Sequence, residues 1–502
     1  MRVDQGGVLR RAICALRAAG PLPLVFFMSL VLSYLALRGK VNPNADGILY
    51  VDAARLLLSD GLRAAQQLYD WLFLSVLIAG LSAVSGLDVQ SAAYLLAAVL
   101  MAMVGVALVG ITRELYPAAT WAAVAVVLAL PALNNYRDFI IREHGSWLFT
   151  LVSLWLLIRW GRSKGLLLVF GSQLSLLVAA LFRPESLAFL SVPFLWLLFS
   201  RRSDLSWRDL RQFLILPACG VLALLVAVVG LDVSIIAGKL LRQLQAANLP
   251  AQLDAFYAAA DRVGEQLSHY VMGADARRLL FVGLLSLIPI KFFTNLGLFS
   301  VPFLYAQGKQ SRVEWTKGGH AVPLLWAAGL YTVILAGLVF EIYFMQARFL
   351  ALLNLFFVPI LALGLLRLWQ VAGKWRWLVA FLAVVSAVDN VYTSSPPNTR
   401  YEDSAAWILE ERFDRQRIFY EPPEVAYLSG AVHRIHPSQS CMSRALLLTS
   451  ECQERFDLYV IRSGWGGDEL LSWAEANGFV LLREFSDRRK AVVYVFERRV
   501  TR

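Results

Sequence analysis

The residues best suited to chemistry lie in one polar run, residues 134–145, which reads Asn-Asn-Tyr-Arg-Asp-Phe-Ile-Ile-Arg-Glu-His-Gly. Strongly apolar segments flank this run on both sides. Ionisable groups next to hydrocarbon are costly and mark a functional site by default. Arg137, Asp138 and Glu143 are the candidates, because a guanidinium binds anions and a carboxylate accepts protons. The run therefore indicates a site for an anionic substrate carried by the membrane.

Composition assigns the chain to the membrane proteins. Of its 502 residues, 58% are hydrophobic and 17% are charged, and the mean hydropathy is +0.59. One soluble core could not hide so much apolar surface. We therefore expect a mainly α, polytopic membrane protein whose partners include membrane lipids and exclude nucleic acid.

Apolar windows long enough to cross a bilayer predict about eleven transmembrane helices. A further apolar segment, Trp71 to Gly86, is short, and its crossing would place the short basic loops outside, against the positive-inside rule. We interpret it as a juxtamembrane or re-entrant helix, with the N-terminus in the cytoplasm. The predicted spans are residues 22–37, 91–111, 119–134, 146–160, 165–182, 186–200, 212–231, 279–305, 320–341, 348–367 and 377–392.

This topology brings charged residues from four separate loops to the non-cytoplasmic side. They are Asp46, the cluster from Arg137 to His144, Arg183 with Glu185, and Glu341 with Arg348. Nucleoside triphosphates are not normally available there, and the chain has neither a Walker A sequence nor a dinucleotide fingerprint. An activated donor would have to arrive within the membrane.

The rest of the chain predicts an appended soluble domain. Residues 1–392 form the membrane domain, residues 393–399 a turn-rich linker, and residues 400–502 a small α/β domain expected in the periplasm. Its predicted strands are residues 417–420, 458–461, 480–485 and 491–496, with helices at 404–413 and 468–477. Cys441 and Cys452 are candidates for a disulfide in that oxidising compartment.

A long external loop, Leu231 to Arg278, shows apolar residues at helical spacing between charged ones. This pattern predicts amphipathic helices at the membrane interface, placed to cover an entry cavity for lipid.

The order of these elements resembles a known family over about the first 390 residues. An external Asp followed by a Tyr and small residues resembles the first loop of GT-C glycosyltransferases. The run reads Asp46-Gly47-Ile48-Leu49-Tyr50-Val51-Asp52-Ala53-Ala54. The likeness continues through residues 71–86, Arg137 with Asp138, Phe182-Arg183-Pro184-Glu185 and Gln346-Ala347-Arg348-Phe349. The nearest branch in layout contains the protein O-mannosyltransferases and lipid A aminoarabinose transferases.

The resemblance implies an inverting glycosyltransferase of the inner membrane that takes a sugar from a polyprenyl-phosphate donor. The acceptor would be a glycan, lipid or protein of the cell envelope. Asp46 would act as the catalytic base, near Tyr50, while Arg137, Arg183 and Arg348 would bind the phosphate. Many relatives carry paired acids in the first loop, whereas Ala45 precedes Asp46 here.

Several alternatives stay open at this stage. Asp138 and Glu143 could orient the acceptor, hold an arginine or bind a divalent metal ion, so a cofactor is left undetermined. Asp46 could instead cap a helix, and the arginines could form structural ion pairs. Two other functions also fit: a flippase or transporter of a lipid-linked saccharide, and a structural subunit of an envelope assembly complex.

Overall fold

The structure is a computed structural model. It describes residues 20–38, 42–199, 209, 211–214, 249–267, 273–308, 321–391, 399–411, 417–431, 456–463, 467–486 and 492–498. The chain divides into two compact units. Unit 1 contains Met1–Ser33, Val99–Arg137 and Glu143–Tyr392, and unit 2 contains Tyr34–Ala98, Asp138–Arg142 and Thr393–Arg502. The predicted pair Cys441 and Cys452 lies outside the described residues.

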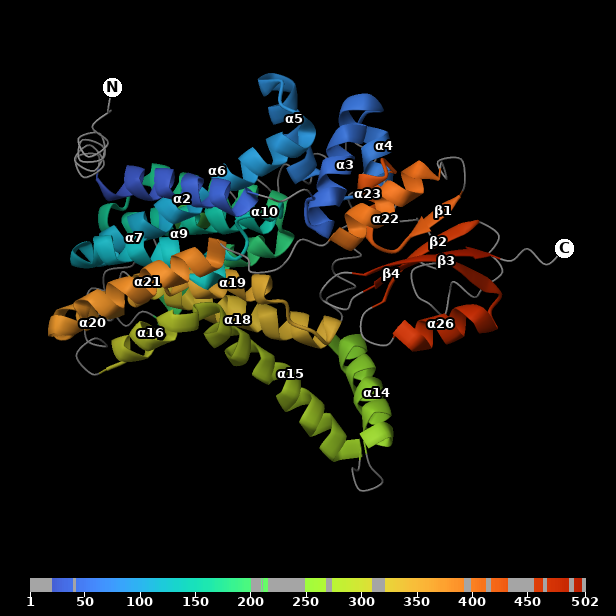
Figure 1. The fold of residues 1–502 in the computed structure, drawn as a ribbon. Helices are drawn as coiled ribbons and strands as arrows, with labels where there is room; N and C mark the ends of the chain where they lie inside the picture. Colours follow the sequence, from blue (N-terminus) through green and yellow to red (C-terminus); the bar gives the residue numbers. More distant parts are fainter. Residues whose placement is uncertain are drawn as a thin grey trace, which may run out of the picture. The chain divides into compact units, whose positions relative to one another are not determined.

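Unit 1 is helical in its described residues (Figure 1). Two helices, α2 and α6, have one end in unit 2. The helices in chain order are α2 (Pro21–Leu37), α6 (Val89–Leu115), η1 (Pro117–Ala119), α7 (Thr120–Ala129), α8 (Pro131–Asn134), α9 (Glu143–Ser163), α10 (Leu166–Phe182), η2 (Pro184–Ser191), α11 (Val192–Phe199), α14 (Leu249–Leu267), α15 (Gly273–Leu296), η3 (Gly297–Phe299), α16 (Ser300–Ala306), α18 (Val322–Ile342), α19 (Ala347–Phe356), α20 (Val358–Val371), η4 (Gly373–Trp375) and α21 (Arg376–Val391).

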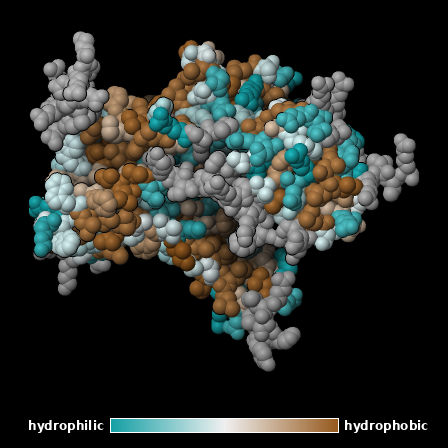
Figure 2. Space-filling view, viewed as in Figure 1, coloured by the Kyte–Doolittle hydropathy of each residue, from teal (hydrophilic) through white to brown (hydrophobic). Residues whose placement is uncertain are grey.

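Three described helices are long and apolar enough to cross a membrane: Val89–Leu115, Asp275–Ala306 and Val322–Ile342. The bent pair α19 and α20 makes a fourth if it counts as one span. Broad apolar areas lie on the face of the helical region that Figure 2 shows. Phe27, Leu167 and Val333 are among the exposed apolar side chains, as expected of a surface that faces lipid.

Helices occupy all the predicted spans except 212–231, most of which lies outside the described residues. The number of crossings, and the side of the membrane on which each loop lies, stay predictions. The segment predicted not to cross forms α5 (Phe73–Ser85), a helix of 13 residues. Such a helix is about 20 Å long, shorter than the hydrocarbon core of about 30 Å.

One predicted span is broken. Residues 348–367 were expected to form a continuous helix, but α19 and α20 meet at a bend of 66°. Pro359, near the start of α20, lacks the backbone N–H that would continue the hydrogen bonds of α19 into α20. Before the bend, α15 holds α19: Asn295 donates to the carbonyl of Ala347 at 2.8 Å and to Asn354 Oδ1 at 3.3 Å. Asn354 in turn donates to the Phe292 carbonyl at 3.0 Å.

Unit 2 combines helices with a four-stranded sheet. The strand order is β1-β2-β4-β3, in which β1 and β2 are parallel and the other pairs are antiparallel. The elements are α3 (Ala45–Ser59), α4 (Leu62–Leu68), α5, α22 (Thr399–Glu410), β1 (Ile418–Tyr420), α23 (Pro423–Leu428), β2 (Leu458–Ser463), α26 (Gly467–Ala476), β3 (Phe479–Ser486) and β4 (Val492–Arg498).

Alternation along β2 explains the layers of this sheet. Leu458 and Val460 pack with side chains of α22 and α23, whereas Tyr459 and Ile461 pack with α26 on the opposite face (Figure 1). All four predicted strands and both predicted helices are present, although α22 begins five residues earlier than expected. The predicted division between residues 1–392 and 400–502 stays a prediction.

The Asn295 contacts give a first prediction. Asn295→Ala is expected to lower the free energy of unfolding by about 1 kcal/mol, because hydrogen bonds between membrane helices average about 0.6 kcal/mol and this loss leaves buried acceptors. Unfolding in detergent titrated with SDS measures it. Thr294→Ala is the control, since exposed Thr294 donates only to the Ile290 carbonyl of its own helix. Equal stability of the two variants would contradict the prediction.

Candidate active site

Asp46, the predicted base, lies in the first turn of α3 in unit 2. The Asn44 side chain before it accepts a hydrogen bond from the Ile140 N–H at 2.8 Å. A Cβ on Gly47 would lie 2.8 Å from Asn44 Oδ1 and 3.0 Å from Ile140 Cβ. Glycine is therefore required at position 47 for this close approach. The first turn of α3 is consequently fixed, and Asp46 is partly exposed on it.

Unit 2 also contains the predicted residues Tyr50 and Asp138. Tyr50 is 5% exposed and lies edge to face with Tyr69, at 5.7 Å between ring centroids. The Tyr69 hydroxyl accepts from Arg142 at 3.1 Å. Asp138, on the same short segment as Arg142, is 7% exposed. Both charged residues therefore belong to the unit that carries α3.

A second set of charged residues meets in unit 1. Glu143 begins α9, Arg183 follows the last residue of α10, and Arg348 lies in the first turn of α19. Arg183 Nη1 donates to Glu143 Oε1 at 2.8 Å, and Arg348 Nε lies 3.8 Å from the same oxygen. Arg183 also pairs with Glu185 through Nε. Three of the residues predicted from separate loops are thus brought to one place.

The helix ends explain why these side chains converge. Arg183 has an extended backbone, with φ −145° and ψ 114°, because Pro184 follows it and α10 ends there. Helices α9 and α10 pack closely here, since a Cβ on Gly145 would lie 2.3 Å from the Phe182 ring. Burial lowers the pKa of Arg183, but Glu185 and Glu143 outweigh it and leave that pKa above its ordinary value. Arg183 is therefore charged at physiological pH.

Sequence reasoning missed the role of two aromatic residues in this cluster. The guanidinium groups of Arg183 and Arg348 each lie 5.3 Å from the centroid of the Phe349 ring, a separation at which cations and rings attract. The Tyr331 hydroxyl donates to the Phe349 carbonyl at 2.8 Å and fixes that residue from α18. Phe349 stands beside Arg348 in the sequence, whereas nothing in the sequence pattern singles out Tyr331.

Arg137 occupies a separate place in unit 1, where it is 1% exposed. Its Nε donates to Asn134 Oδ1 at 2.6 Å, and its Nη1 donates to the Ser29 carbonyl, the Ser29 hydroxyl and the Ser33 hydroxyl at 2.8–3.1 Å. Its Nη2 has no hydrogen-bond partner among the described residues. Two serines four residues apart in an apolar helix were the sequence signal for this contact, and it was missed.

Asn134 explains how Arg137 is positioned. Pro131 ends α7, and the Asn134 side chain donates to two carbonyls of that region, Val127 at 3.0 Å and Leu130 at 2.7 Å. These bonds satisfy the end of α7 and leave Asn134 Oδ1 to accept from the guanidinium. No carboxylate of the described residues forms a salt bridge with Arg137. Neutral oxygens alone therefore surround this buried cation.

His144 follows Glu143 in the first turn of α9. Its ring is fully buried and lies 5.4 Å from the Trp147 ring. Burial lowers the pKa of His144 to about 3, the positive charge of Arg137 acts in the same direction, and the backbone of Tyr136 opposes both. The residue stands just before the predicted span 146–160 and is neutral at physiological pH.

Within the described part of the chain, no three His, Cys, Asp or Glu side chains gather in a way that would hold a metal ion.

Comparison with known proteins gives the fold. No protein-family model matches the chain, and no curated protein matches it. Among solved structures, an oligosaccharyltransferase from Archaeoglobus fulgidus in complex with zinc and sulfate is similar to 88% of this chain over 67% of its own, with a TM-score of 0.50 and 12% identity. The chain has the GT-C glycosyltransferase fold.

ArnT from Cupriavidus metallidurans in the apo state is also similar, over 95% of this chain and 98% of its own, with a TM-score of 0.43 and 13% identity. At such identities the likeness concerns the fold alone. The resemblance stated from the sequence is confirmed at that level. The roles of the individual residues stay predictions.

The pKa of His144 gives a second prediction. In the unfolded chain this pKa is about 6.5, so the folded protein, whose value is about 3, holds the neutral form. The stabilisation is complete above pH 6.5 and is lost as the pH falls toward 3, by at most about 1.4 kcal/mol per pH unit. His144→Phe keeps a ring against Trp147 and removes the titration. Unfolding curves in detergent at pH 7 and pH 5 measure both proteins, and an identical pH dependence would contradict the prediction.

Proposed function

We propose that this chain is an inverting membrane glycosyltransferase that takes a sugar from a polyprenyl-phosphate donor at the periplasmic face of the inner membrane. The acceptor is a glycan, a lipid or a protein of the cell envelope. The observation that carries the proposal is the meeting of Arg183 and Arg348 at one buried carboxylate, Glu143, in a chain with the GT-C fold.

The proposed reaction is a single displacement. The acceptor oxygen forms a bond to the anomeric carbon while the bond from that carbon to the phosphate oxygen breaks. The acceptor proton passes to the carboxylate of Asp46, and the electron pair of the broken bond stays on the leaving polyprenyl phosphate. Because no protein nucleophile intervenes, the configuration at the anomeric carbon inverts.

The arginines stabilise the charge that develops on the leaving phosphate. Arg183 and Arg348 suit this role because guanidinium groups remain charged and donate paired hydrogen bonds to phosphate. Glu143 holds both of them, which is one of the roles left open for this residue in the sequence. Arg137, buried among neutral oxygens, adds a positive potential that also reaches His144.

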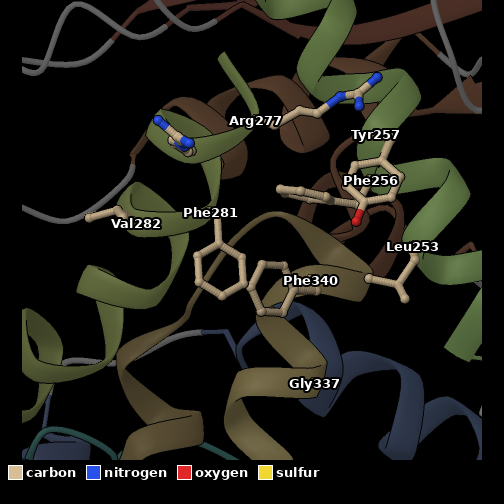
Figure 3. A pocket seen from close by; sticks show the side chains of 9 residues that line it. Leu253, Phe256, Tyr257, Arg277, Phe281, Val282, Gly337 and Phe340 are labelled. Carbon is tan, nitrogen blue, oxygen red and sulfur yellow. The ribbon is translucent and has the colours of Figure 1, made fainter. Parts of the chain in front are cut away.

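An apolar cavity of about 350 Å³ in unit 1 suits the hydrocarbon chain of the donor. Helix α14, one of the amphipathic helices predicted in the external loop, forms part of its wall with α15 and α18 (Figure 3). Three aromatic rings line the cavity. The rings of Phe281 and Phe340 stack with 5.2 Å between their centroids, and the ring of Phe256 lies edge to face with that of Phe340, with 5.4 Å between centroids.

Helix α18 connects this cavity with the charged cluster. Tyr331 belongs to the cluster, and Gly337, which lines the cavity, follows six residues later, about 9 Å along the helix. A lipid whose phosphate lies at Arg348 could therefore place its hydrocarbon chain in the nearby apolar cavity.

Asp46→Asn gives the third prediction. This variant is expected to lose transfer by at least about 100-fold while it still binds the polyprenyl-phosphate sugar, because only proton transfer is removed. Purified protein with the donor and an envelope extract as acceptor measures both quantities. Asp60→Asn is the control, since Asp60 is an exposed acid at the other end of α3. Lipid binding or translocation by the wild-type protein without transfer would instead support the transporter or the assembly subunit.

Gly337→Leu gives the fourth prediction. A Cβ at Gly337 meets no atom within 4 Å, so the larger side chain fits the fold and fills the cavity. The KM for a long-chain donor is expected to rise about tenfold, the equivalent of about two buried methylene groups, whereas the KM for a donor with a very short chain stays unchanged.

Gly329→Leu is the matched control for the cavity, because Gly329 is exposed on the same helix, has the same open space and does not line the cavity. An equal rise in KM for both variants, or for both donors, would show that the cavity does not bind the donor chain.

A further inference from the structure

The hydroxyl of Tyr427 connects three helices of unit 2. It accepts a hydrogen bond from Arg55 Nη2 of α3 at 2.9 Å and donates one to Gln90 Oε1 of α6 at 2.6 Å. The Arg55 guanidinium also lies 4.8 Å from the centroid of the Tyr427 ring. A phenol has one proton to donate, so the two bonds together fix the direction of the hydroxyl.

Arg55 is held from its other side by its own helix. Its Nη1 pairs with Asp52 Oδ1 at 3.2 Å, and Asp52 is 3% exposed. The guanidinium thus connects a buried acid of α3 with a tyrosine that is more than 370 residues away in sequence. A charge-assisted bond to a planar guanidinium is both stronger and more directional than a contact between neutral groups.

These contacts set the position of α3 at its C-terminal end. At the N-terminal end, the bond between Asn44 and the Ile140 N–H sets it. Asp46 lies nine residues before Arg55 on the same helix, about 14 Å away. Because a helix of this length is stiff, a change at Arg55 shifts the carboxylate of Asp46.

We propose that Tyr427 is a positioning residue for the transfer reaction: through Arg55, the C-terminal residues hold helix α3 so that Asp46 stands where the acceptor proton leaves. The inference rests on the proposed role of Asp46 as the base. It gives residues 399–498 a part in the chemistry, although they contain none of the reacting groups.

The state of the phenol agrees with this role. Tyr427 is half-buried, and burial raises its pKa above the ordinary value, while Arg55 opposes that shift. The hydroxyl therefore keeps its proton at physiological pH and continues to donate to Gln90. An ionised tyrosine could not form both bonds.

Tyr427→Phe in the full chain tests the proposal, because it keeps the ring over Arg55 and removes both hydrogen bonds. We expect kcat to fall about tenfold through misplacement of the base, with the KM for the donor unchanged. Hydrogen exchange of the peptide covering residues 45–59 is expected to become several-fold faster. Gln90→Ala, which keeps the bond to Arg55, is expected to show a smaller change in both measurements.

Tyr420→Phe is the matched control. Its hydroxyl accepts a hydrogen bond from Ser429 at 3.1 Å, within the same C-terminal segment, so neither kcat nor exchange of residues 45–59 should change. Unchanged exchange in Tyr427→Phe would overturn the proposal, and so would faster exchange with an unchanged kcat. Retained turnover in Asp46→Asn would mark a failure of the proposed base instead, because exchange of α3 does not depend on that role.

Discussion

The structure depends on how charges are compensated in a chain made mostly of apolar residues. Glu143 is the clearest case, since one of its oxygens lies within 4 Å of two guanidinium groups. An isolated carboxylate or guanidinium with so little exposure would be strongly destabilising. The paired arrangement of Glu143 and Glu185 with Arg183 and Arg348 allows several charges to persist together.

Interruptions of regular helices supply this arrangement. Arg183 stands where α10 ends before Pro184, and Arg348 stands in the first turn of α19, shortly before the 66° bend. In continuous helices such side chains would lie at different depths of the hydrocarbon, and each would need a polar or charged partner of its own. Helix ends instead gather charged groups and unsatisfied backbone groups at one depth. The same principle explains Arg137, which follows the short helix that begins at Pro131.

The sequence predicted the elements better than their connections. The strands of unit 2 were predictable because short runs of apolar, β-branched and aromatic residues are bounded by polar residues. Glu143, Arg183 and Arg348 were predictable as charges beside apolar spans. The bend near Phe357 was not expected, because residues 348–367 form one mostly apolar run of the length of a span. Pro359 was the signal in the sequence for a break there, and it was missed. That two arginines share one carboxylate oxygen, and that Tyr331 fixes Phe349, follow from packing that no local pattern records.

The proposed function requires the guanidinium cluster to bind the phosphate of a lipid. The decisive measurement is the binding of a polyprenyl phosphate, and of the matching uncharged polyprenol, to the purified protein. We expect the wild-type protein to prefer the phosphate by at least about tenfold, and Arg348→Gln to lose this preference while its affinity for the polyprenol is unchanged. Equal affinity of the wild-type protein for the two lipids, or an undiminished preference in Arg348→Gln, would contradict it.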